Sequence, residues 1–87
     1  MKNIKHLFEN EVTKKILLFF NENPHSIDTV KGISIWVNCD ADTVEKSVSQ
    51  LAEHGILINY KTTSIDAYSY TNHKDILKEI EKHIKNL

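Results

Sequence analysis

The residues that could bind a metal or react chemically are one cysteine, five histidines and a group of carboxylates. Cys39 stands beside Asp40, and Asp42 follows two positions later. A zinc site needs three or four convergent ligands, and the sequence has neither a Cys-x-x-Cys nor a His-x-x-x-His spacing. It therefore predicts no metal and no cofactor. We expect Cys39 to pack as a small apolar residue, with metal or thiol sensing as the alternative.

No other motif indicates catalysis. The two glycines, Gly32 and Gly55, do not open a helix after a strand, so the chain has no glycine-rich phosphate loop. No serine or cysteine has a recognisable base partner, and a core of this size leaves little room for a pocket. The sequence predicts a protein that is not an enzyme.

The chain has 87 residues, which leaves room for one domain and one hydrophobic core across 1–87. Its longest apolar run, Ile16–Phe20, is too short for a signal peptide or a membrane span. We therefore expect a cytoplasmic protein with no membrane partner.

Charge is unevenly distributed along the chain. The net charge is −1, and all eleven basic residues are lysines. The segment 26–71 has three lysines against six acidic residues, a net charge of −3, whereas each flank has four lysines against three acids, a net charge of +1. Any polyanionic partner would meet this acidic middle segment.

The segment 40–55 carries the clearest helical pattern. Val44, Val48 and Leu51 recur at i, i+4 and i+7, which places them on one narrow stripe. Asp40 is a favourable N-cap residue, and Gly55 is a favourable terminator. The remaining face is polar, so the pattern predicts a helix that presents a long polar surface to a partner.

Other helices are expected on both sides of this segment. The first runs from about Asn10 to Glu22 and ends before Pro24. The second begins at Asp28 or Thr29, after a short extended piece at 25–27. It has apolar residues every three or four positions, and we expect its Trp36 to lie partly in the core, with docking to a partner as the alternative. We attribute the glycine in this helix to close approach of another helix. The apolar positions are Val12, Ile16, Phe19 and Phe20 in the first helix and Val30, Ile33, Trp36 and Val37 in the second.

After Gly55 the periodicity changes to that of a β-hairpin. The segments 56–62 and 66–71 are rich in β-branched and aromatic residues and are joined by a short polar connection. Tyr68 and Tyr70 fall on one face of the second strand, where we expect them to pack. A further helix begins at Asn72 or His73.

Two stretches resemble the winged helix-turn-helix family. The family's turn and recognition helix are similar to residues 28–57, DTVKGISIWVNCDADTVEKSVSQLAEHGIL. The family's wing is similar to residues 58–71, INYKTTSIDAYSYT. The likeness is to small bacterial or archaeal regulators of the MarR-like and ArsR-like kind. It implies a mainly α fold with a small antiparallel β-hairpin, formed by residues 10–71, and an added C-terminal helix over 72–87.

The resemblance also implies that the segment 40–55 binds double-stranded DNA as a transcriptional regulator does, with modest specificity. The residues that would face base edges are Ala41, Asp42, Thr43, Glu45, Lys46 and Ser49, with Lys61 of the wing on a phosphate. The alternative is a protein-interaction module without DNA binding, because winged helices also serve in docking.

The spacing of apolar residues in the C-terminal helix predicts a homodimer. Leu77, Ile80, Ile84 and Leu87 follow the three, four, three spacing of a two-helix coiled coil. The alternative is that this helix folds back on the first helix of its own chain and closes the monomer core.

Overall fold

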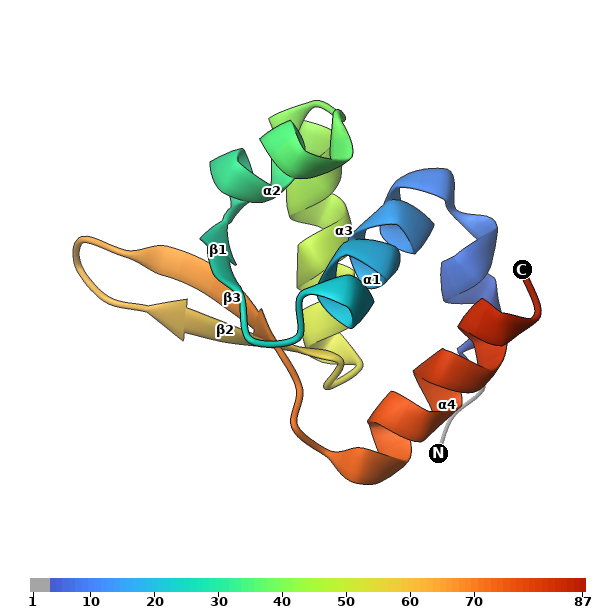
Figure 1. Ribbon diagram of the computed structural model, residues 1–87. Helices are drawn as coiled ribbons and strands as arrows, with labels where there is room; N and C mark the ends of the chain where they lie inside the picture. The colour runs from blue at the N-terminus through green and yellow to red at the C-terminus, as the bar shows by residue number, and fades with distance from the viewer. Residues whose placement is uncertain (1–3) are drawn as a thin grey trace.

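The computed structural model describes residues 4–87 and arranges them as three strands and five helical segments (Figure 1). The chain passes from a 3-10 helix to α1, then through β1, α2 and α3 to the β2–β3 hairpin and α4. The bounds are η1 (Lys5–Glu9), α1 (Glu11–Glu22), β1 (Ile27–Thr29), α2 (Val30–Val37), α3 (Ala41–Glu53), β2 (Leu57–Lys61), β3 (Asp66–Tyr70) and α4 (Lys74–Lys85). Within residues 4–87, no helix combines the length and the apolar character needed to cross a membrane.

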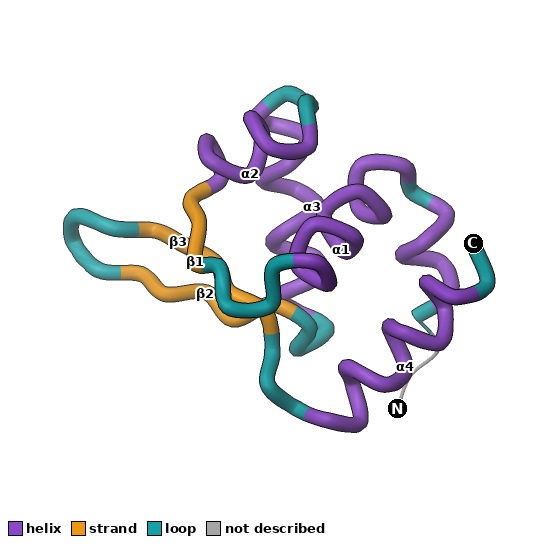
Figure 2. The backbone as a smooth tube through the Cα atoms, viewed as in Figure 1, coloured by secondary structure: helices purple, strands orange, loops and turns teal. Residues whose placement is uncertain are grey.

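The strands form one antiparallel sheet in the order β1-β3-β2. β2 and β3 are the expected hairpin, which projects from the body of the molecule (Figure 2). β1 is an additional strand, and its pairing places Ile27 opposite Ser69. The extended piece expected at 25–27 is therefore displaced by two residues and belongs to the sheet.

Local hydrogen bonds fix the connection from α2 to α3. The Thr29 hydroxyl accepts a hydrogen bond from the Gly32 amide at 3.1 Å and caps α2. Asn38 ends α2 in the left-handed conformation, with φ 57° and ψ 49°, a region that asparagine tolerates better than most residues. The Cys39 amide then donates to the Ser34 carbonyl at 3.1 Å. This turn sets the direction in which α3 leaves.

Gly32 is explained by a side chain rather than by a second helix. A Cβ atom at this position would collide with the carboxylate of Asp28, which lies over the first turn of α2. The expectation of close helix approach at Gly32 is therefore wrong.

One hydrophobic core joins the helices to the inner face of the sheet. The stripe expected on α3 is confirmed, because Val44, Val48 and Leu51 are all fully buried. Tyr68 and Tyr70 are also buried, as expected. On α1 the buried face is rotated slightly from the expected one, so that two expected core residues, Val12 and Phe19, lie at its edge. The residues of α1 that are fully enclosed are Thr13, Ile16, Leu17 and Phe20.

Trp36 lies outside the core, contrary to expectation. Its side chain is 69% exposed, and its ring stacks on Phe19 with centroids 5.7 Å apart. The eight-residue helix α2 is too short to bury a wide face, and only Ile33 and Val37 reach the interior.

The C-terminal helix closes the core of its own chain. Ile80 is 0% exposed and lies in the same cluster as Ile4 and Leu7 from the N-terminal segment. Phe8 of η1 stacks on His83 of α4 with ring centroids 5.1 Å apart. Figure 1 shows the dark blue η1 beside the red end of α4.

Because α4 packs on the core, most of the expected dimer seam (Leu77, Ile80, Ile84 and Leu87) is covered by the chain itself. Leu77 and Ile84 pack against the core, while Leu87 is 63% exposed. Ile80 is enclosed by its own chain and is not available to a second copy. The observed packing corresponds to the alternative in which α4 folds back on the protein body.

The architecture is that of a winged helix: mainly α, with a small antiparallel sheet and an added C-terminal helix. α1, α2 and α3 form the helical part, and the β2–β3 hairpin is the wing. The fold class expected from the sequence is confirmed.

Candidate nucleic-acid interface

The outer side of α3 is a continuous polar surface. The buried side chains of α3 all lie on the opposite side of the helix; they are Val44, Ser47, Val48 and Leu51. Asp42, Glu45 and Lys46 are exposed, and Ser49 and Gln50 are half-buried. Of the six residues of α3 that were expected to face a partner, four lie together on this face, namely Asp42, Glu45, Lys46 and Ser49. Ala41 is exposed at the start of the helix, whereas Thr43 is half-buried and lies away from Glu45 around the helix.

Two residues at the start of α3 are occupied in capping it. The Asp40 carboxylate accepts hydrogen bonds from the Thr43 amide at 2.9 Å and from the Thr43 hydroxyl at 2.8 Å. Both bonds favour the ionised form, so they hold the pKa of Asp40 below its ordinary value. Thr43 therefore donates its hydroxyl proton within the chain, and only its methyl group and its acceptor lone pairs remain for a partner.

Lys61 is at the outer end of strand β2 and is exposed. Strand alternation gives it the same sheet face as Leu57, which is buried against the helices. The Lys61 side chain thus leaves the wing on the helical side of the sheet. On the neighbouring strand, Asp66 lies opposite Lys61 in the register and accepts a hydrogen bond from Asn59 at 2.7 Å.

The polar surface of α3 is negative. Asp42, Glu45 and Glu53 line a shallow depression on this face together with one cation, Lys46. Lys46 makes no ion pair among residues 4–87. It is therefore the one cation on this face that could meet a phosphate or a guanine.

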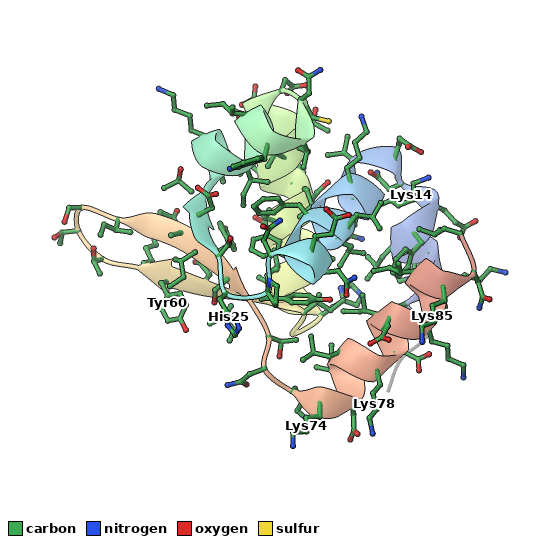
Figure 3. All side chains as sticks on the ribbon, in the orientation of Figure 1. Lys14, His25, Tyr60, Lys74, Lys78 and Lys85 are labelled. Carbon is green, nitrogen blue, oxygen red and sulfur yellow. The ribbon has the colours of Figure 1, made fainter. Side chains whose placement is uncertain are left out.

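Most of the remaining lysines are on other elements. Figure 3 shows Lys74, Lys78 and Lys85 projecting from the outer side of α4. Lys85 pairs with Glu81 at 3.2 Å. α4 thus carries four of the eleven lysines, Lys74, Lys78, Lys82 and Lys85, whereas α3 carries Lys46 alone.

Cys39 and His54 make contacts within the protein that account for their positions. Cys39 is a free, half-buried thiol that packs against the core, and its sulfur lies 3.4 Å from the Val37 carbonyl oxygen. His54 Nδ1 lies 2.9 Å from the Gln50 carbonyl oxygen near the end of α3. Residues 4–87 contain no group of three or more histidine, cysteine or acidic side chains placed to hold a metal.

A second exposed surface surrounds Trp36, for which the sequence left docking to a partner as the alternative to a place in the core. It is a groove between α1 and α2 with Phe19 and Trp36 at its centre, and we call it the α1–α2 groove. Its lining residues include Lys15, Leu18, Phe19, Glu22, Trp36 and Val37. The sequence signal that could have revealed it was the apolar residue Leu18 on the polar side of α1.

Comparison with protein-family models and with curated proteins finds no match. Among solved structures, the chain is similar to a possible transcriptional regulator from Methanosarcina mazei Go1. The two share 20% sequence identity with a TM-score of 0.70, and the alignment covers 95% of this chain and 74% of that one. At this identity the likeness concerns the fold alone.

Proposed function

We propose that this protein is a DNA-binding, transcriptional-regulator-like winged helix of modest specificity, related in mode of action to MarR-like and ArsR-like regulators. The observation that carries the proposal is the polar face of α3, whose Asp42, Glu45 and Lys46 are exposed and which follows a fixed turn beside the hairpin. An α-helix fits the major groove of B-form DNA, and residues in its first turns reach base edges. The fold shared with a possible transcriptional regulator supports the same function.

In this proposal α3 supplies a small set of contacts. Lys46 donates to a guanine or a phosphate, while Asp42 and Glu45 accept from cytosine amino groups. Ala41, Thr43 and Ser49 contribute van der Waals contacts and hydroxyl groups, and Lys61 binds a phosphate beside the groove.

The number of phosphate contacts must be low because few lysines lie near α3. Lys46, Lys61 and Lys31 of α2 are the candidates, and all three are exposed. Binding releases about 0.9 counterions per neutralised phosphate, so we expect the logarithm of affinity to fall against log salt with a slope of about −2 to −3 per subunit.

A titration of the folded protein with duplex DNA at two salt concentrations tests the proposal. Lys46→Ala should weaken binding by about 1 to 3 kcal/mol if it contacts a base. Lys78→Ala, on the outer side of α4, is the matched control and should leave affinity within about twofold. Absence of binding in low salt by a folded protein would exclude DNA as the partner.

The charge of α3 favours one second candidate, the docking of a basic protein segment. Asp42, Glu45 and Glu53 would then pair with cations of the partner, and Lys46, which lies among them, would not contribute an attractive contact. Under this candidate, duplex DNA does not bind. A lysine-rich peptide then binds the wild type and loses affinity with Glu45→Gln.

A further inference from the structure

We propose that the α1–α2 groove binds a second copy of this chain, so that α1 packs antiparallel against α1 of its partner about a two-fold axis. The groove is independent of the α3 surface, so the inference does not rest on DNA binding. It replaces α4 as the surface on which dimerisation depends.

The first observation is an apolar centre that the chain itself leaves uncovered. Trp36 is 69% exposed although it stacks on Phe19 at 5.7 Å. Leu18 and Phe19 are only half-buried, and Val37 forms the floor of the groove. Exposed tryptophan in an apolar pocket is the residue type most enriched at the centres of protein interfaces.

The second observation is the position of the charges around this centre. Lys15 and Glu22 are both exposed and border Leu18 and Phe19 at equal distances along α1. They are seven residues apart, or about 10 Å along the helix. Neither side chain makes an ion pair among residues 4–87, whereas the neighbouring Lys14 pairs with Glu11 at 3.2 Å.

This charge pattern is complementary to itself. A two-fold interface brings the same patch of both copies together, so every contact of one residue with a different residue of the partner occurs twice, with the two roles exchanged. With the axis between Leu18 and Phe19, an antiparallel partner places its Glu22 against Lys15 and its Lys15 against Glu22. The two apolar centres then cover each other, with one ion pair at each end.

The groove fits another copy better than a charged partner. It carries one cation and one acid at opposite ends, so its net charge is zero, and it offers no excess charge for a nucleic acid or a basic peptide. The patch is small compared with the roughly 800 Å² per partner of a standard interface. We therefore expect a weak dimer, with a dissociation constant of about 10 to 100 μM.

The geometry of α1 determines how the two copies are oriented. The groove residues of α1 fall within an arc of about 100°, opposite the buried arc from which Thr13 contacts Ser47 of α3. The polar faces of the two α3 helices therefore point away from each other. Such a dimer does not place both α3 helices on neighbouring half-sites of one duplex.

Sedimentation equilibrium of the full chain, from micromolar to about 1 mM, tests the inference. We expect the mass to rise toward twice that of one chain. The emission of Trp36, the only tryptophan, should shift to shorter wavelength over the same range. Trp36→Ala should weaken association at least tenfold.

A charge swap makes the test specific for this interface. Lys15→Glu and Glu22→Lys should each weaken the dimer about tenfold, because each places two like-charge pairs across the axis. The double variant Lys15→Glu/Glu22→Lys should recover wild-type association, because it restores both pairs in reversed order. Lys78→Glu makes the same charge change on α4 and should have no effect.

Two results would overturn the inference. A wild type that stays monomeric to about 1 mM would show that the groove is left to solvent or to another occupant. A dimer that the double variant weakens as much as the single variants would place the interface elsewhere. Circular dichroism of each variant confirms that the exposed substitutions leave the fold intact.

Discussion

At the scale of single residues, Tyr70 is the group whose chemistry the fold alters most. Its hydroxyl is buried without a hydrogen-bond partner among residues 4–87, and its ring stacks on Phe20 at 6.0 Å. Burial, with a smaller contribution from the negative charge of Glu81, raises the pKa of Tyr70 from 10.0 to about 12. Both effects disfavour the phenolate in the folded chain.

This shift predicts a loss of stability at alkaline pH. Below pH 10 the proton is bound in both states, so stability is unaffected. Between pH 10 and about 12 the unfolded chain releases the Tyr70 proton while the folded chain keeps it, so the free energy of unfolding falls. Tyr70→Phe removes this titration and a hydroxyl that has no partner. Urea unfolding at pH 9 and pH 11 should show a smaller pH effect in Tyr70→Phe than in the wild type, and equal effects would contradict the assignment.

Gly32 and Asp28 form the second residue-scale feature. Alanine in place of glycine inside a helix normally stabilises it by about 1 kcal/mol, but here the added methyl group meets the Asp28 carboxylate. We therefore expect Gly32→Ala to stabilise the Asp28→Ala background by about 1 kcal/mol and to give little or no gain in the wild type. Thermal unfolding of the four proteins measures the difference. Equal effects in both backgrounds would show that the two positions do not interact.

At the scale of the elements, α1 and α3 are joined by a buried polar contact. The Thr13 hydroxyl donates to the Ser47 hydroxyl at 3.0 Å, and both residues are buried. Thr13→Val leaves the Ser47 hydroxyl without this partner and should cost about 1 to 3 kcal/mol. In the Ser47→Ala background the same change should cost less. Urea unfolding of the double-mutant cycle checks this, and additive costs would show that the contact does not contribute.

The sequence predicts an element well when its signal is local. The α3 stripe of Val44, Val48 and Leu51 repeats at helical spacing, and Asp40 provides the cap, so neighbouring residues determine this helix. β1 has no such signal, because its three residues become a strand only by pairing with β3, some forty positions away.

At the candidate site, too, only the features with a local sequence signal could be predicted. Periodicity predicted the polar face of α3 correctly, because burial on one side of a helix leaves the other side exposed. It did not predict the exposure of Trp36, since an apolar residue near a helical stripe is covered only if a neighbouring element reaches it. No local pattern in the sequence favoured the alternative in which Trp36 docks a partner. Recognising that alternative requires knowing how α2 is placed against α1.

At the scale of the whole molecule, the two ends of the chain complete the core. Ile4 and Leu7 precede the first helix that was expected from the sequence, yet each is 1% exposed. They meet Ile80 of α4 in one cluster. A chain of this size buries a modest fraction of its surface, and these residues from both ends belong to its hydrophobic core cluster.

Ile80 therefore separates the two roles considered for α4. If α4 formed a coiled-coil seam between copies, Ile80→Lys would give a folded monomer. Because Ile80 is 0% exposed within its own chain, the substitution buries an unpaired charge and should cost about 4 kcal/mol or more, a large part of the 5 to 15 kcal/mol typical of a domain. Leu87→Lys, at a position that is 63% exposed, is the matched control and should change stability by less than about 0.5 kcal/mol. Circular dichroism during thermal unfolding distinguishes the outcomes, and an Ile80→Lys protein with the wild-type melting temperature would restore α4 as the dimer surface.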